Sequence, residues 1–315
     1  MAAPRHQEAT SASGGFTLIL GAGAIGRLWA ASLPPQRVRF IPRDTVPAAR
    51  CCEYRLQAAD GNQYPASIPY CETAQPLPRA DCLLVTTKAA DALPALERHI
   101  TRLPRDIPVV LFQNGMGSQQ RIAARWPERP ILAAVTTEGA NNPSAHLTIH
   151  AGRGQTSIGS LTPNAEHCLP TVVRHLQNSR LRVFPEPEIH QRLWQKLIVN
   201  AGINPFTALL NCVNGDILAH PFYLQHIDPL CQELHQLMAR EGLNSPSADA
   251  LRETIETVAR ATALNTSSMR ADVLKNRPTE IDYINGYVAS RGEALNLELA
   301  TNRMLAERVR ALTHC

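Results

Sequence analysis

Residues 16–33 read FTLILGAGAIGRLWAASL, and this stretch decides the fold. Its first five residues are almost all apolar, as expected of a buried strand. From residue 24 onward the apolar residues recur at spacings of three and four, which predicts a helix. The turn between the strand and the helix carries the pattern G-x-G-x-x-G, formed by Gly21, Gly23 and Gly26.

This glycine pattern has a physical use when it joins a strand to a helix. Gly21 permits the tight turn, Gly23 lets the backbone approach a pyrophosphate, and Gly26 lets the helix pack closely on the strand. The free N–H groups at the helix N-terminus then face the phosphates. The alternative is a strand-to-helix turn that binds nothing. The position of the pattern at the start of a β-α-β alternation favours a dinucleotide site.

Strand and helix signals alternate through the first half of the chain. Strands are predicted at 16–20, 37–41, 81–87, 107–113 and 131–137, with helices at 24–33 and 90–100. Such alternation indicates a parallel sheet covered by helices. Residues 146–160 are predicted to form a hairpin with a Gly-rich turn, followed by a helix at 166–179 and a last strand at 181–186. We therefore expect an α/β fold with a Rossmann-type parallel-sheet domain over residues 16–187.

Strand signals stop after Pro187. Helices are predicted at 188–211, 221–242, 247–264, about 278–292 and 297–313. We expect an all-helical C-terminal domain over residues 188–315 that carries the substrate and catalytic groups. Residues 1–15 are small and polar and are expected to be a flexible tail.

Composition excludes several classes of protein. No apolar run approaches the roughly 18 residues of a membrane span, and the basic residues are scattered rather than clustered, so neither membrane nor nucleic acid is an expected partner. The eight cysteines contain no C-x-x-C pair. We expect reduced thiols, a cytoplasmic location and no metal site.

Polar residues follow three of the predicted strands. Ligands of open parallel sheets bind beyond the carboxyl ends of the strands, where Lys88 and Asn114 stand, with Ala140 at the same edge. Arg43 lies about 20 residues after the glycine loop, where a cation favours the 2′-phosphate of NADP. The alternatives are ordinary surface charges for Arg43 and Lys88 and a turn residue for Asn114, and the adjacent Asp44 counts against NADP.

A polar stripe interrupts the apolar helix predicted at 188–211. Lys196, Asn200 and Asn204 are four residues apart and share one helix face. Polar groups in such apolar surroundings need partners, so we interpret the stripe as the lining of a cleft; the alternative is a surface stripe. An ammonium there can protonate the alkoxide formed when a ketone accepts hydride, and partial desolvation would lower its pKa.

The segment NTSSMRADVLKNRPTEIDYINGY, residues 265–287, is the third candidate element. Ser267 and Ser268 precede a helix-like run, Pro278 is expected to open another helix, and Glu280 is expected in its first turn. Ser268 as a helix N-cap and Glu280 as a charge suited to the helix dipole are alternatives that need no ligand.

Together these segments resemble the ketopantoate reductase (2-dehydropantoate 2-reductase) family. The resemblance spans about residues 16–310 and is carried by LGAGAIGRLW, LLVTTKA, QNGMG, LWQKLIVNAGINPFTALLNCVNG and SSMRADVLKNRPTEIDYINGY. The last two are far more specific than the glycine loop. The sequence departs from the family pattern at Glu138 and Gly139, and Pro42 precedes Arg43.

The resemblance implies a role for each matching residue. Cofactor contacts are implied for Gly21, Ala22, Gly23, Ala24, Ile25, Gly26, Arg43, Lys88, Asn114, Ala140 and Glu280. Substrate contacts are implied for Asn114, Lys196, Asn200, Asn204, Asn214, Ser268, Met269, Arg270 and Ala271. Lys196 matches the family's proton donor, and Glu280 matches a glutamate that supports catalysis.

The activity that the resemblance implies is reduction of 2-dehydropantoate to (R)-pantoate by NADPH, in pantothenate and coenzyme A biosynthesis. The alternatives are a related NADPH-dependent reductase of another 2-oxo acid and a non-catalytic NADPH sensor. The sequence leaves the oligomeric state open between a monomer and a homodimer.

Overall fold

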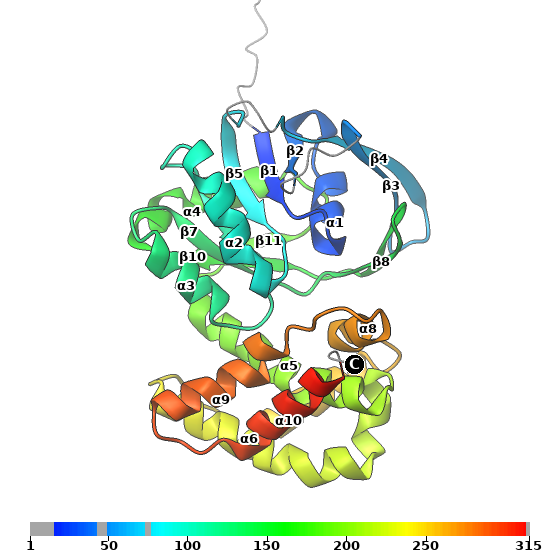
Figure 1. Cartoon of the computed structure of the whole chain (residues 1–315), viewed down its shortest axis with the longest axis vertical. Helices are drawn as coiled ribbons and strands as arrows, with labels where there is room; N and C mark the ends of the chain where they lie inside the picture. Colours follow the sequence, from blue (N-terminus) through cyan, green and yellow to red (C-terminus); the bar gives the residue numbers. More distant parts are fainter. Residues whose placement is uncertain (1–15, 43–48, 73–76, 313–315) are drawn as a thin grey trace, which may run out of the picture.

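The computed structural model describes residues 16–42, 49–72 and 77–312. These residues form two bodies, one built on β-sheets and one built of helices (Figure 1). The sheet body contains every described strand and helices α1–α4, and the helical body contains α5–α10. The predicted α/β class with a helical C-terminal part is therefore confirmed. The predicted tail at 1–15 lies outside the described residues.

The main sheet has seven strands in the order β11-β10-β7-β6-β5-β1-β2. All neighbouring strands in this sheet are parallel except the pair β10 and β7, which is antiparallel. The strands are β1 (Phe16–Leu20), β2 (Val38–Ile41), β5 (Ala80–Val85), β6 (Val109–Leu111), β7 (Ile131–Thr136), β10 (Thr156–Ser160) and β11 (Val183–Pro185). The strands predicted from the sequence at these positions are confirmed.

Helices cover both faces of this sheet, and alternation of side chains along the strands explains how. On β1, Leu18 packs in the cluster that includes α2 residues, whereas its neighbour Ile19 packs in the cluster that includes α1 residues. Successive strand residues point to opposite faces, so a strand covered on both sides is apolar throughout. The helices are α1 (Ala24–Ser32), α2 (Ala89–His99), α3 (Ser118–Arg125) and α4 (Pro163–Leu176).

A second sheet of four strands, in the order β4-β3-β9-β8, curves beside α1 (Figure 1). Its strands are β3 (Cys51–Gln57), β4 (Gln63–Pro69), β8 (Gly139–Ser144) and β9 (Leu147–Gly152). The sequence interpretation contained neither β3 nor β4. Alternation marks β3, because Cys52, Tyr54 and Leu56 are buried while Glu53 and Arg55 are exposed.

The predicted hairpin at 146–160 is wrong. β9 pairs with β8 and β3 in the second sheet, whereas β10 pairs with β7 and β11 in the main sheet. The Gly-rich segment is a crossing between the sheets rather than a turn. A Cβ atom on Gly154 would lie 2.3 Å from the carbonyl carbon of Thr137, so glycine is required there for close approach of two backbones.

The central helix of the helical body is α5 (Ile189–Leu210). It is apolar on nearly all sides, as expected of a helix that other helices cover. Around it lie α6 (Pro221–Arg240), α7 (Ala248–Ala261), α8 (Ser268–Leu274), α9 (Asn285–Ala294) and α10 (Ala300–Ala311). Short 3₁₀ helices occur at η1 (Pro35–Arg37), η2 (Ile100–Arg102), η3 (Asn214–Ala219) and η4 (Ile281–Tyr283). None of the described helices is both long and apolar enough to cross a membrane.

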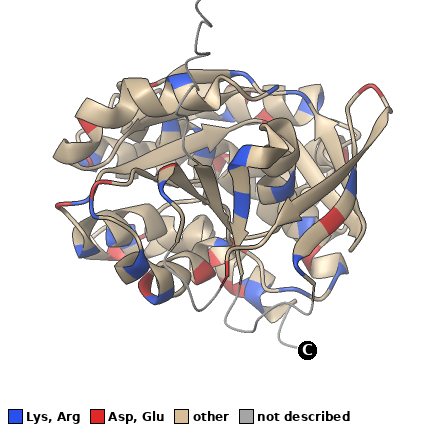
Figure 2. Cartoon of the chain, turned by 90° about the horizontal axis from the view of Figure 1, so that it is seen from above, with Lys and Arg blue, Asp and Glu red and all other residues tan. Residues whose placement is uncertain are grey.

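Charged residues of both signs are interspersed over both bodies (Figure 2). The formal net charge of +4 is therefore spread over the molecule.

Candidate active site

The glycine loop is tightly packed at Gly21 and Gly26 and open at Gly23. Gly21 has φ +113°, and a Cβ atom on Gly26 would lie 2.0 Å from the Gly21 carbonyl oxygen. A Cβ atom on Gly23 would meet only the Thr86 carbonyl oxygen, at 3.9 Å, so that side of the loop is open. Among the residues that the structure describes, no side chain caps α1, and its first turn contains no acidic residue. The N–H groups of Ala24 and Ile25 are thus left for an anionic ligand.

The neighbouring strand fixes this loop. The hydroxyl of Thr86, at the end of β5, donates to the Gly21 carbonyl oxygen over 2.7 Å. The Thr86 N–H donates to the carbonyl oxygen of Leu20 over 2.9 Å. Arg43, expected at the 2′-phosphate end of the cofactor, lies outside the described residues.

Lys88 joins the two bodies. It stands at the N-cap of α2, and its ammonium pairs with the Asp272 carboxylate on α8 and donates to the Pro278 carbonyl oxygen over 2.8 Å. Asp272 is 6% exposed and also pairs with Arg277 over 3.0 Å. A buried carboxylate without cations would be costly, so Asp272 needs these partners. Lys88 thus lies at the junction of the bodies rather than on an open surface.

Glu280 also reaches across the junction. Its carboxylate accepts from the Ala89 N–H over 3.1 Å and from the Asn114 side-chain amide over 3.1 Å. Burial raises the pKa of Glu280, while the bond from Asn114 acts in the opposite direction. Residues from the ends of two strands of the main sheet and from the helical body therefore meet at one carboxylate.

The prediction that a helix begins at Pro278 is wrong for its first turn, which is not helical. Helical structure starts only with η4 at Ile281, and Glu280 precedes it. The backbone here is tied to the sheet body instead of to itself, because the Tyr283 carbonyl oxygen accepts from the Met116 N–H over 2.8 Å. A Cβ atom on Gly115, at φ +73°, would lie 2.0 Å from that same oxygen. Gly115 is therefore required for the two bodies to touch at this point.

Lys196 enters the same junction from α5. Its ammonium donates to the Thr136 carbonyl oxygen at the end of β7 over 2.9 Å. Burial lowers the pKa of Lys196 to about 8, and the negative charge of Glu280 opposes the shift. The expected reduction of its pKa is thus present, and its cause is desolvation. A lysine in this state is mostly protonated at neutral pH and is a stronger acid than an exposed lysine.

The three asparagines differ in how they are held. Within the described residues, the side-chain amides of Asn200 and Asn204 form no hydrogen bond, although Asn204 is buried. Asn214 donates to the Thr262 hydroxyl over 2.9 Å, and its side-chain oxygen is buried without a partner. Buried polar atoms without partners are rare and costly. These amides therefore have free hydrogen-bonding capacity for a polar ligand.

The segment 267–271 divides between structural and exposed positions. Ser267, not Ser268, is the N-cap of α8: its hydroxyl oxygen accepts from the Arg270 N–H over 3.1 Å. Ser268 is the first helical residue and is exposed. Met269 packs in the core of the helical body, so its side chain does not face the junction. Arg270 donates to the Asn211 side-chain oxygen over 3.0 Å, and Ala271 is half-buried.

Two groups in the junction were not anticipated from the sequence. Asp272 lies within the segment that carries the family resemblance, but no role was assigned to it there. The Thr136 carbonyl oxygen is a backbone atom and leaves no side-chain signal. Ala140 lies on β8, opposite His150 of β9.

Comparison with known families gives two matches. The family described as "Ketopantoate reductase PanE/ApbA" matches residues 17–163, and the one described as "Ketopantoate reductase PanE/ApbA C terminal" matches residues 188–313. The 2-dehydropantoate 2-reductase of Vibrio cholerae is 35% identical over 299 residues, which cover 94% of this chain and 97% of the relative.

Solved structures share the fold over almost the whole chain. The probable 2-dehydropantoate 2-reductase of Bacillus subtilis is 26% identical and superposes with a TM-score of 0.77, covering 94% of this chain and 99% of its own. A D-mandelate dehydrogenase solved with NADH and anilino(oxo)acetate is 20% identical and superposes with a TM-score of 0.83. The match covers 95% of this chain and 98% of the dehydrogenase chain. At that identity the second likeness concerns the fold alone.

Proposed function

The chain belongs to the ketopantoate reductase family, and we propose that it reduces 2-dehydropantoate to (R)-pantoate with NADPH. The observation that carries this proposal is the position of Lys196. Its ammonium lies at the junction of the two bodies, has a pKa lowered to about 8, and feels the charge of Glu280. A proton donor in this state suits reduction of a ketone.

The sheet body, over residues 16–187, binds the cofactor in this proposal. The open side of Gly23 and the uncapped N-terminus of α1 hold the pyrophosphate. Arg43 binds the 2′-phosphate, and Lys88, Asn114, Ala140 and Glu280 lie toward the nicotinamide end. When bound, NADPH would supply the hydride that reduces the C2 carbonyl of the substrate.

The helical body, over residues 188–315, holds the substrate and delivers the proton. As negative charge builds on the oxygen at C2, the Lys196 ammonium donates its proton to that oxygen. Glu280 supports this step, because its charge keeps Lys196 protonated against the effect of burial. Turnover leaves Lys196 neutral, and it recovers a proton from water.

The substrate is oriented by side chains that have free hydrogen-bonding capacity in the structure. The amide N–H groups of Asn200 and Asn204 donate to the carbonyl and hydroxyl oxygens of the substrate, and their amide oxygens accept from its hydroxyl groups. The exposed hydroxyl of Ser268 donates to its carboxylate, beside Arg270 and Ala271. Asn214 is held by Thr262 and contributes through its unpaired side-chain oxygen. Met269 contributes only through its backbone.

An absorbance assay tests the proposal. The purified chain is mixed with NADPH and 2-dehydropantoate, and loss of NADPH is followed beside controls with NADH and with other 2-oxo acids, an aryl one included. Fast oxidation that requires both NADPH and 2-dehydropantoate is expected. If only a different 2-oxo acid is reduced, 2-dehydropantoate is not the substrate. NADPH binding without reduction of any 2-oxo acid would refute the enzymatic role. A cytoplasmic location and the choice between monomer and homodimer remain expectations of this proposal.

A further inference from the structure

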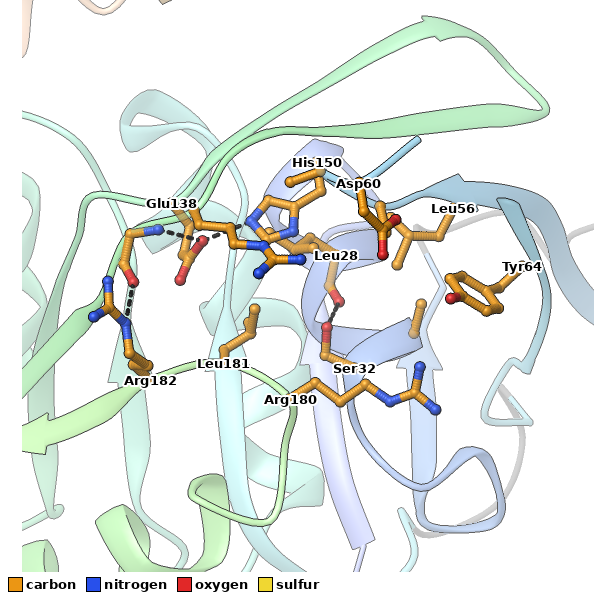
Figure 3. Close-up of a pocket in the computed structure, with 15 residues that line it drawn as sticks. Leu28, Ser32, Leu56, Asp60, Tyr64, Glu138, His150, Arg180, Leu181 and Arg182 are labelled. Atoms are coloured by element: carbon orange, nitrogen blue, oxygen red, sulfur yellow. Dashed lines mark hydrogen bonds and ion pairs between the residues drawn. The ribbon is translucent and has the colours of Figure 1, made fainter. Parts of the chain in front are cut away.

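A cavity lies in the sheet body and is lined by residues other than those of the candidate active site. It has a volume of about 620 Å³ and lies between α1, the second sheet and the segment before β11 (Figure 3). On α1 it uses Leu28, Ala31 and Ser32, near the end of the helix opposite the glycine loop. Its volume lies within the range of small-molecule sites.

One wall of this cavity is apolar. Leu28 comes from α1, Leu56 from β3 and Leu181 from the segment before β11, and Figure 3 shows all three beside the cavity. Leu28 and Leu56 belong to the core on that face of the main sheet. The wall is therefore rigid, and it presents only a small apolar area to a ligand, because none of the three leucines is more than 8% exposed.

Three guanidinium groups line the cavity, on Arg153, Arg180 and Arg182. Arg182 donates to the Gly154 carbonyl oxygen over 3.1 Å, and Arg180 lies over the ring of Tyr64 with 5.8 Å between its Cζ and the ring centre. Within the described residues, none of the three forms an ion pair with a carboxylate. Guanidinium groups match the planar geometry of carboxylates and phosphates, so the cavity has unused capacity for an anion.

The acidic residues of the cavity are already engaged. The Glu138 carboxylate is buried, lies 2.6 Å from Nε2 of His150 and accepts from the Gly154 N–H over 2.9 Å. Asp60 accepts from the Asn62 N–H over 3.0 Å. That bond, together with the charge of Arg153, lowers the pKa of Asp60. In the part of the chain that the structure describes, neither carboxylate forms an ion pair with Arg153, Arg180 or Arg182.

We propose that this cavity binds a small amphipathic anion, in which a phosphate or carboxylate group is attached to an apolar body. The anionic group lies against Arg153 and Arg180, and the apolar body packs on Leu28, Leu56 and Leu181. The Glu138–His150 pair forms the polar end of the site. The proposal concerns residues that the reduction does not use, so it stands or falls independently of the proposed function.

Isothermal titration calorimetry tests the site, with saturating NADP⁺ present so that the glycine loop is occupied. Phenyl phosphate and hexanoate are titrated as phosphate and carboxylate probes, and inorganic phosphate serves as the anion without an apolar body. At least one of the two amphipathic probes is expected to bind at one site per chain. Inorganic phosphate is expected to bind at least about tenfold more weakly, because it cannot bury area on the apolar wall.

Variants assign the binding to this cavity. The double substitution Arg153→Gln and Arg180→Gln removes two exposed cations, and it is expected to weaken probe binding by about tenfold or more. Arg260→Gln is the matched control, since Arg260 is an exposed arginine of α7 in the helical body. Equal affinity in the wild type and the double variant would overturn the proposal. So would the absence of binding by both amphipathic probes, or inorganic phosphate binding as tightly as they do.

Discussion

The pH dependence of turnover follows from the environment of Lys196. Its pKa is lowered to about 8, and a general acid must be protonated to act. Activity is therefore present below pH 8 and lost as the pH rises through that value. At pH 7 about nine-tenths of the molecules carry the proton and at pH 9 about one-tenth, so kcat/KM should fall about tenfold between them.

The assay is NADPH oxidation with 2-dehydropantoate, with kcat/KM measured across this range because it reports the free enzyme. Glu280→Gln provides the internal test. Removing its negative charge removes the one contribution that raises the pKa of Lys196, so the alkaline limb should move to lower pH. A profile that falls only near pH 10, as for an exposed lysine, would refute the reasoning from burial. An alkaline limb unmoved in Glu280→Gln would refute the coupling.

Further predictions concern single residues. Lys196→Ala should lower kcat by about 10²–10⁴-fold with a smaller change in KM, and steady-state rates near those of the wild type would contradict its role. Gly26→Ala places a Cβ atom 2.0 Å from the Gly21 carbonyl oxygen and should abolish NADPH binding in a fluorescence titration, which unchanged affinity would disprove. Asn200→Ala should raise KM for the keto acid while the Kd for NADPH stays the same; a change in the Kd alone would place Asn200 at the cofactor instead. Asp272→Asn removes the carboxylate that pairs with Lys88 and should weaken NADPH binding and lower the melting temperature, whereas an unchanged Kd would show that this pair does not position Lys88.

The sequence predicted the main sheet well because its strands follow a simple physical rule. Strands covered on both faces are continuously apolar, as in residues 82–85 and 131–135, and a polar residue follows each run. The stripe of Lys196, Asn200 and Asn204 was recognisable for the same reason, since polar residues are conspicuous in a helix that is otherwise apolar.

The second sheet was harder to predict because its strands are only partly buried. β4 is mostly exposed and contains two prolines, which count against a strand in sequence patterns. β9 and β10 looked like a hairpin because they are adjacent in sequence and flank glycines. Tertiary contacts decided otherwise: the Glu138 carboxylate binds the Gly154 N–H and pairs with His150, and this directs the chain from one sheet to the other.

The junction between the bodies depends on contacts that sequence periodicity cannot reveal. Glu280 was identified through the family resemblance, but its position just before η4 follows from backbone bonding between Met116 and Tyr283. Lys88 was predicted to end a strand, but β5 ends at Val85 and Lys88 is the N-cap of α2; its partner Asp272 lies 184 residues away. Pairings over such separations are determined by the packing of the two bodies.

Transfer of deuterium tests the central claim most directly. The chain is incubated with 2-dehydropantoate and NADPH deuterated at the carbon of the nicotinamide that gives up hydride, and the product is identified by chiral chromatography and mass spectrometry. The account predicts (R)-pantoate carrying the deuterium at C2, formed far more slowly by Lys196→Ala. Absence of pantoate, pantoate without the label, or equal rates in the two proteins would contradict it.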